Sequence, residues 1–291
     1  MPVLNLREVD DYLCFDDEQC AAAGQALAQA YQTATPFPHI VIEDFVEAAI
    51  LRRVVERFPD RRGHRFFDRD QERLKFQFDP PQIESGLTRN LLSELNSAAF
   101  LAFLEAMTGI KGLIPDPYFS GAGLHETLAG GHLGIHADFN VHGKMNLERR
   151  LNLLIYLNED WQPQFGGALE LWDKAMRQSC RSVLPTLGTA VVFSTDRNSF
   201  HGHPDPLTCP EDRSRRSIAT YYYTAIDGGD DISRTTTVFK VRPNSRDVAD
   251  VSVRVENFLA NWMPPRLLGP AKRVARKLFA ASPARTQERA E

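Results

Sequence analysis

Cysteine is scarce in this chain of 291 residues, and long apolar runs are missing. The four cysteines, Cys14, Cys20, Cys180 and Cys209, are scattered without a C-x-x-C pair, which argues against a disulfide framework. No stretch approaches the ~18 uninterrupted apolar residues that a membrane-spanning helix requires. The first residues also lack a basic segment followed by an apolar run. We therefore expect no signal peptide and a cytoplasmic protein with reduced thiols.

An excess of positive charge is absent as well. The formal net charge is −4, which argues against a protein that binds nucleic acid through its overall charge. The charge is uneven, however, because residues 264–291 hold seven Lys or Arg against two Glu. Within this tail, residues 270–281 (PAKRVARKLFAA) predict a basic amphipathic helix. Two interpretations stay open: a helix packed on the domain with a solvated basic face, or peripheral contact with an anionic membrane. The sequence predicts no oligomeric state.

The first part of the chain predicts mainly helices. An apolar content of 43% is ample for a packed core. Helices are predicted at 19–31 and 46–58, one or two helices at 88–108, a strand at 39–44, and a hairpin or a mobile loop at 60–80. We divide the chain into flanking helices and first strands (1–112), a core (113–242) and a basic helical extension (243–291).

After Gly112 the pattern changes to short apolar runs separated by Gly, Pro, Asn and Asp. This pattern is typical of an all-β protein, and a jelly roll, or double-stranded β-helix, is the expected fold. The fold class is therefore predicted as mainly β with flanking helices. Strands are predicted near 116–126, 132–139, 149–157, 167–172, 181–184, 189–194, 199–203, 215–226 and 235–241.

A short motif inside this region, His136-Ala137-Asp138, carries candidate metal ligands. Side chains alternate between the faces of a strand, so His136 and Asp138 project to one side while Ala137 faces away. A third ligand is available from His201 or His203, which share one face if their segment is extended. Two histidines and one carboxylate form a facial triad, which leaves coordination positions open on non-haem Fe(II).

The order of these motifs resembles that of the Fe(II)- and 2-oxoglutarate-dependent dioxygenases, in particular their prolyl 4-hydroxylase-like branch. The resemblance rests on His136, Asp138, His201 and Arg215, and on the segments LNLLIYLN and GGALELW between them. It covers roughly residues 36–226. The resemblance implies a double-stranded β-helix that binds Fe(II), 2-oxoglutarate and O2, with ascorbate as a candidate reductant.

The resemblance also implies roles for the metal-binding residues. His136 and Asp138 would bind Fe(II). His201 is favoured as the distal ligand, because in the family this histidine usually follows an aromatic or apolar residue, here Phe200. His203 stays the alternative, either as a ligand or as a residue that steers a ligand or the substrate. An Asp, rather than the Ala of halogenase-type sites, points to hydroxylation.

The distal carboxylate of 2-oxoglutarate needs a cation, and the family pattern Arg-x-Ser matches Arg215 and Ser217. A guanidinium binds a planar carboxylate through two parallel hydrogen bonds. Arg213 and Arg216 stay alternative candidates for this carboxylate. For each of the three arginines, a charged position on the protein surface is the other interpretation.

Tyr156 is a further candidate for the same carboxylate, together with Asn152 on the same strand face. A tyrosine buried only for packing would give the same pattern. The family often carries another cosubstrate contact on the strand before the metal pair. Here His125, Glu126 and Thr127 are all candidates, and the sequence does not single out one of them.

The resemblance implies a reaction that decarboxylates 2-oxoglutarate to succinate and CO2 and hydroxylates an unactivated C–H bond. The substrate is expected to be a prolyl residue or another small or peptidyl molecule. No protein acid or base is required, so no catalytic residue is expected beyond the metal ligands. Two rivals stay open: a cupin-type protein that uses His136, His201 and His203 for another metal reaction, and a noncatalytic, membrane-associated binding module.

Overall fold

The computed structural model describes residues 1–226 and 234–248. Residues Met1–Asp247 form one compact unit, and the second unit is Val248–Glu291. The basic helix expected at 270–281 lies outside the described residues, so it stays a prediction, as does the three-part division of the chain. None of the described helices is long and apolar enough to cross a membrane.

The expected helices are confirmed, and the segment 88–108 forms two of them, because Ser97 caps the second one through its hydroxyl. Gly109, with a φ of 77°, ends that helix. Within the described residues the helices are α1 (Asp17–Gln32), α2 (Ala48–Glu56), α3 (Gly86–Glu94), α4 (Ala98–Thr108), η1 (Pro80–Gln82) and η2 (Pro163–Phe165). The strands are β1 (Leu6–Val9), β2 (Tyr12–Phe15), β3 (His39–Ile42), β4 (Arg65–Arg69), β5 (Glu72–Phe78), β6 (Ile114–Pro115), β7 (Gly123–Ala137), β8 (Glu148–Tyr156), β9 (Leu169–Trp172), β10 (Ser179–Val183), β11 (Ala190–Ser194), β12 (His201–His203), β13 (Ser214–Thr224) and β14 (Val238–Phe239).

Strand β7 joins the two halves of the main sheet. The strand order is β10-β9-β12-β7-β13-β8-β11-β3, and β5 and β14 also pair with β7. The first half of β7 pairs with β13, where Thr127 lies opposite Arg215. The second half pairs with β12, where His136 lies opposite His201. One strand therefore carries residues from the region of Arg215 to the predicted metal ligands.

The prediction of separate strands at 116–126 and 132–139 is wrong, because the chain continues as one strand through Gly130 and Gly131. Gly130 has a φ of 76°, which favours glycine. A Cβ on Gly131 would lie 2.7 Å from the backbone oxygen of Arg73. The glycine pair therefore bends β7 and lets it approach β5 instead of ending the strand.

The charged and aromatic segment 60–80 is a hairpin joined to the main sheet. β4 and β5 pair with each other, and β5 continues along β7 with Lys75 in register. On the other face of β7, the buried carboxylate of Glu126 accepts hydrogen bonds from Arg61 and Arg216. These contacts fix the hairpin, so of the two alternatives for this segment the structure shows the hairpin.

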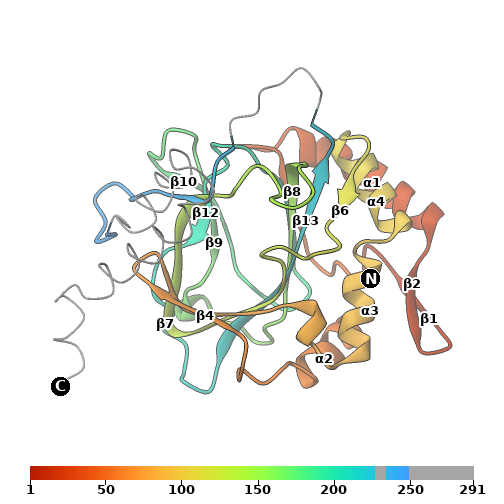
Figure 1. Ribbon diagram of the computed structural model, residues 1–291, viewed down its shortest axis with the longest axis horizontal. Helices are drawn as coiled ribbons and strands as arrows, with labels where there is room; N and C mark the ends of the chain where they lie inside the picture. Colours follow the sequence, from red (N-terminus) through yellow and green to blue (C-terminus); the bar gives the residue numbers. More distant parts are fainter. Residues whose placement is uncertain (227–233, 249–291) are drawn as a thin grey trace. The chain divides into compact units, whose positions relative to one another are not determined.

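The helices α1–α4 lie together on one side of the sheet (Figure 1). Leu153 of β8 and Ile218 of β13 face these helices and are buried in the same apolar core. Because side chains alternate along a strand, Asn152, Tyr156 and Arg215 turn to the opposite face, toward the interior of the double-stranded β-helix. The predicted fold class, mainly β with flanking helices, is confirmed.

Candidate metal and cosubstrate site

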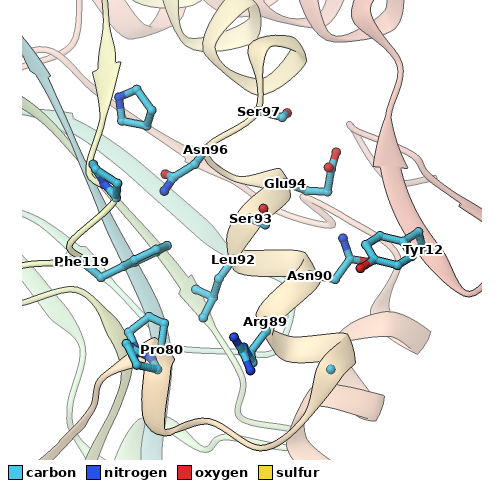
Figure 2. Close-up of a pocket in the computed structure, with 14 residues that line it drawn as sticks. Tyr12, Pro80, Arg89, Asn90, Leu92, Ser93, Glu94, Asn96, Ser97 and Phe119 are labelled. Atoms are coloured by element: carbon cyan, nitrogen blue, oxygen red, sulfur yellow. The ribbon is translucent and has the colours of Figure 1, made fainter.

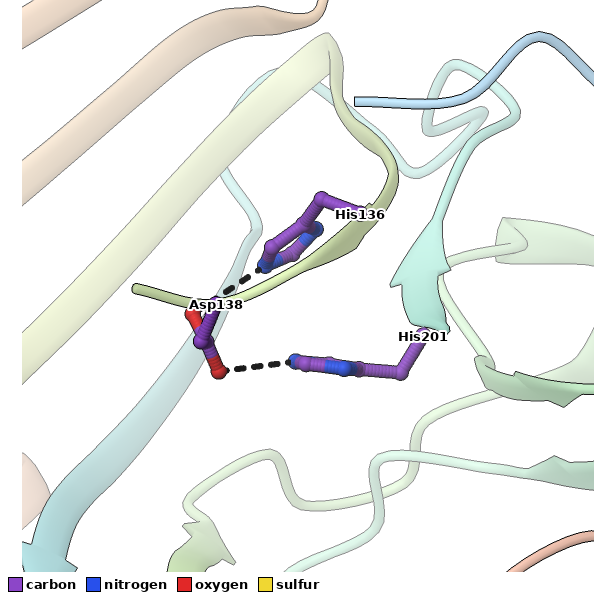
Figure 3. A group of neighbouring side chains, drawn as sticks. All are labelled: His136, Asp138 and His201. Carbon is purple, nitrogen blue, oxygen red and sulfur yellow. Dashed lines mark ion pairs between the residues drawn. The ribbon is translucent and has the colours of Figure 1, made fainter. Parts of the chain in front are cut away.

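Three side chains with metal-ligating atoms meet where β7 and β12 lie side by side (Figure 3). One ligand atom each from His136, Asp138 and His201 lies within 4.8 Å of the others. His136 Nε2 is 3.7 Å from Asp138 Oδ1, and His201 Nε2 is 3.5 Å from Asp138 Oδ2. The antiparallel register explains the meeting, because His201 lies opposite His136 in the ladder and Asp138 directly follows β7.

The two imidazoles are held with Nε2 free to bind a cation. Nδ1 of His136 lies 2.9 Å from the carbonyl oxygen of Gly134, and Nδ1 of His201 lies 2.9 Å from that of Ser199. Because a carbonyl oxygen only accepts, each Nδ1 carries the proton and each Nε2 keeps its lone pair. Burial, followed by the nearby His136, lowers the pKa of His201 to about 4. His201 is therefore neutral near pH 7, which is the form that binds metal ions.

Glycine permits the close contact of β7 and β12. A Cβ on Gly202, which separates the two histidines of β12, would lie 2.6 Å from the backbone oxygen of Gly134. A side chain there would push the strands apart and separate His201 from His136. The glycines around the metal motif thus have a steric role.

The carboxylate of Asp138 is held by two donors on β8. Asn152 Nδ2 donates to Oδ2 at 2.8 Å, and Arg149 Nη2 lies 3.1 Å from the same oxygen. Burial alone would raise the pKa of Asp138, but the charge of Arg149 and the two imidazoles outweigh it and hold that pKa below its ordinary value. The carboxylate is therefore ionised and can bind a cation.

Asn152 has a different place from the one that the sequence suggested. It lies on the expected strand face, but its amide group sits between Asp138 and Arg149 rather than beside Arg215. Arg149 Nε and Nη2 donate to Oδ1 of Asn152 at 2.9 and 2.7 Å. Both ends of the Asn152 amide are thus occupied at the metal-ligand group.

Arg215 is a buried cation that pairs with no carboxylate in the described part of the chain. Its Nε donates to the carbonyl oxygen of Gly167 at 2.7 Å, and its guanidinium carbon lies 4.9 Å from the centroid of the Tyr156 ring. Burial lowers the pKa of Arg215, but a guanidinium stays charged in proteins. The buried hydroxyl of Tyr156 has no hydrogen-bond partner among the residues described. The carboxylate of a bound ligand would satisfy both groups.

Ser217 and His203 are buried but lie outside the group of metal-ligating atoms. Ser217 follows Arg215 by two residues on β13 and lies opposite Tyr156 in register. Burial, and then the charge of Arg215, lower the pKa of His203 well below its ordinary value. Nδ1 of His203 has no partner within the described ranges. These residues therefore lie on the Arg215 side of the interior, and His203 is not one of the three clustered ligands.

The remaining candidates divide between the two faces of the sheet. Arg216 binds Glu126 on the outer face, and Arg213 donates to a backbone oxygen instead of facing Tyr156. His125 and Thr127 share the inner face with Arg215, since Thr127 lies opposite Arg215 in the ladder. This alternation removes Glu126 from the candidate cosubstrate contacts.

Sequence reasoning missed the charged residues Arg149, Glu72 and Lys75. Strict alternation would place Arg149 and Asn152 on different faces of β8. The ladder between β8 and β13 is irregular at Arg149, however, and this irregularity turns the Arg149 side chain to the same face as Asn152. Lys75 Nζ lies 2.8 Å from Glu72 Oε1, and after burial its charge is the next cause that lowers the pKa of His125. The only signal in the sequence was charge within predicted strands.

A separate hollow of about 920 Å³ lies along α3 (Figure 2). Tyr12 and Asn90 line one side, and Pro80 and Phe119 line the other. No predicted metal or cosubstrate residue lines this hollow, so it is not part of the candidate site.

Comparison with known proteins shows a family to which part of the chain is similar. The sequence model of the 2OG-Fe(II) oxygenase superfamily matches residues 122–223, which hold all three clustered ligands and Arg215. The curated protein prolyl 3-hydroxylase OGFOD1 of Mus musculus is 30% identical over 96 residues, which make up 32% of this chain and 16% of that protein. The match thus spans about a sixth of the length of that relative.

Two solved structures are similar over most of the described chain. A prolyl hydroxylase from Trichoplax adhaerens, in complex with a hypoxia inducible factor oxygen degradation domain peptide fragment, has a TM-score of 0.52 at 15% identity, covering 71% of this chain and 91% of that one. A prolyl-4-hydroxylase from Pseudomonas putida has a TM-score of 0.48 at 21% identity, covering 70% of this chain and 99% of that one. The likeness to the Trichoplax structure supports the double-stranded β-helix fold and nothing finer.

Proposed function

We propose that this protein is an Fe(II)- and 2-oxoglutarate-dependent dioxygenase that hydroxylates an unactivated C–H bond. The match of residues 122–223 to the sequence model of the 2OG-Fe(II) oxygenase superfamily supports this proposal. The observation that carries the proposal is the pairing of two features in one interior. Three side chains present ligand atoms within 4.8 Å of one another, and the buried cation Arg215 has no carboxylate partner in the described residues.

His136 and His201 would hold Fe(II) through Nε2, and Asp138 would hold it through its carboxylate. The donor set fits this ion, because two imidazoles and one carboxylate form the facial triad of non-haem Fe(II) oxygenases. The Nδ1 hydrogen bonds to Gly134 and Ser199 fix both rings, so little reorganisation is needed when the ion binds. When bound, Fe(II) and 2-oxoglutarate supply the oxygen chemistry, and the protein contributes position and charge.

Arg215 would hold the distal carboxylate of 2-oxoglutarate, with the hydroxyl of Tyr156 as a second donor. The fit is supported by the unpartnered Tyr156 hydroxyl, which is costly to bury without a ligand. Ser217 lies opposite Tyr156 in the ladder and is a further candidate contact. His203, buried and lacking a described partner on Nδ1, would act here rather than as a metal ligand.

The substrate is proposed to be a prolyl residue or another small or peptidyl molecule. The similar proteins named as prolyl hydroxylases support this class. Ascorbate as a reductant and a cytoplasmic location, with peripheral membrane contact through residues 270–281, belong to the same proposal. The cupin-type alternative is less well supported, because it has no use for the buried charge of Arg215 and requires His203 as a ligand.

The test is anaerobic titration of the Fe(II)-loaded protein with 2-oxoglutarate, followed by exposure to O2. Chelation of Fe(II) by 2-oxoglutarate should produce a visible absorbance band, and O2 should then yield succinate in the presence of proline-containing peptides. Asp138→Ala should show neither signal, and Asp212→Ala, at an exposed position, should show both. Absence of the band in the wild-type protein would contradict the proposal.

A further inference from the structure

Arg149 is buried against one of the proposed metal ligands, although no motif pointed to it. Its Nη2 lies 3.1 Å from Asp138 Oδ2, and it is 2% exposed. The guanidinium is clamped between two aromatic rings, with its carbon 3.6 Å from the Tyr221 centroid and 4.6 Å from that of Phe139. Such a clamp fixes the planar group in one orientation, so its donors point in set directions.

Asn152 completes the arrangement. Its Oδ1 accepts from both Nε and Nη2 of Arg149, and its Nδ2 donates to Asp138 Oδ2 at 2.8 Å. Two donors therefore converge on the same oxygen of Asp138. The other oxygen, Oδ1, accepts no hydrogen bond from any residue that the structure describes. Oδ1 is 3.7 Å from Nε2 of His136, and Oδ2 is 3.5 Å from Nε2 of His201, so both oxygens border the ligand group and only the hydrogen bonds distinguish them.

We propose that Arg149 and Asn152 are positioning residues that occupy Oδ2 of Asp138 and leave Oδ1 as the single oxygen offered to the metal. The inference rests on the proposed function. A freely rotating carboxylate can bind a metal through both oxygens and take an extra coordination position. 2-Oxoglutarate and O2 together need three open positions, so a carboxylate restricted to one oxygen is required at this site.

The two residues are also coupled to each other. Because Asn152 and Arg149 are hydrogen-bonded, loss of either one removes a partner of the other as well as one of the two contacts to Asp138 Oδ2. The energetic effects of such a network are not additive. The two residues should therefore act as one unit on metal binding.

The experiment measures Co(II) and Mn(II) affinity of the full chain for Asn152→Ala, for Arg149→Lys and for the double variant. Both substitutions keep the net charge of the site, so a change in affinity reports position rather than charge. Each single variant should weaken metal binding about 10–100-fold, as loss of a residue that orients a metal ligand typically does. The double variant should lose much less than the product of the two single effects.

A spectroscopic measurement separates positioning from a general structural role. The visible spectrum of bound Co(II) should change in both variants, because a released carboxylate alters the coordination number. A merely structural role would lower thermal stability but leave the affinity and spectrum of the folded protein unchanged. Arg150→Lys is the matched control, since Arg150 is the next residue on β8 and donates instead to Thr224. It should bind metal within about twofold of wild type.

The outcomes separate the two claims. If the wild-type chain binds no metal, the proposed function fails. If wild type binds metal and Asp138→Ala does not, yet folded Asn152→Ala and Arg149→Lys keep wild-type affinity and spectrum, only the positioning role fails. Additive losses in the double variant would show that Arg149 and Asn152 do not act as one unit, which also overturns the inference.

Discussion

Two buried arginines face the interior of this protein from neighbouring strands, and they differ in the partners of their guanidinium groups. Arg149 on β8 is paired with Asp138 and Asn152 and lies between two aromatic rings. Arg215 on β13 donates to the backbone oxygen of Gly167, lies beside the Tyr156 ring and has no carboxylate partner in residues 1–226 and 234–248. Both are charged and almost fully removed from water.

This difference indicates that the chain itself supplies the counter-charge of Arg149, whereas a ligand would supply that of Arg215. A buried charge is stable only when another charge or hydrogen bonds offset its desolvation. Arg149 has its counter-charge in Asp138, and so it is suited to hold the Asp138 carboxylate in position. Arg215 lacks one, and so it is suited to receive a carboxylate from outside the chain.

The largest effect is expected from Asp138→Ala, which removes both a proposed metal ligand and the partner of Arg149. Fe(II), Co(II) and Mn(II) binding should fall below detection, because only the two imidazoles remain. Calorimetric titration of each metal ion into the metal-free variant measures the loss of affinity directly. Retention of wild-type affinity would mean that the cation binds elsewhere.

Substitution of the two arginines should change the free energy of unfolding by different amounts. In the metal-free protein, Arg149→Met leaves Asp138 buried without its counter-charge and should lower the free energy of unfolding by about 3–5 kcal/mol. Arg215→Met removes a charge that has no counter-charge, so the change should be small or stabilising. Urea denaturation measures both. Equal losses would contradict the comparison.

Binding of 2-oxoglutarate should depend on Arg215 and not on metal affinity. Arg215→Met should weaken 2-oxoglutarate binding about 100-fold, because charge-assisted hydrogen bonds each contribute about 1.5–3 kcal/mol. Metal affinity should be unchanged. Arg213→Met is the matched control, since Arg213 donates to a backbone oxygen outside this pocket. Calorimetry with a redox-inert metal gives both affinities, and normal 2-oxoglutarate affinity in Arg215→Met would remove this assignment.

The smallest effect concerns the tyrosine beside Arg215. The hydroxyl of Tyr156 has no described partner, so Tyr156→Phe should stabilise the ligand-free protein by about 1 kcal/mol. Tyr222→Phe should destabilise it by a similar amount, because the Tyr222 hydroxyl donates to the carbonyl oxygen of Leu95 at 2.7 Å. Denaturation of the two variants provides the check. A loss of stability in both would mean that Tyr156 is satisfied without a ligand.

Local rules predicted much of this molecule. The two-residue spacing of His136 and Asp138 was enough to predict that they share one side of the chain, since alternation is a property of any strand. The helical pattern was predicted to end at residue 108, and the next residue, Gly109, ends the helix with a left-handed φ of 77°. Mainly β architecture followed from short apolar runs and frequent turn residues.

Other features depend on contacts between distant segments, which spacing does not encode. The side that Arg149 faces depends on an irregularity in the ladder between β8 and β13, and strict alternation gives the opposite side. The partner of Glu126 on the outer face, Arg61, lies 65 residues away in sequence. Two strands, 116–126 and 132–139, were predicted on either side of Gly130, whereas one strand that packs closely against β5 runs through this position.

The most direct test of the account is a crystal structure of the protein with Mn(II) and 2-oxoglutarate. We expect Mn(II) bound by His136 Nε2, His201 Nε2 and a single oxygen of Asp138, with the distal carboxylate of 2-oxoglutarate on Arg215 and the Tyr156 hydroxyl. A metal bound through His203 instead of His201, or a 2-oxoglutarate carboxylate placed away from Arg215, would contradict it.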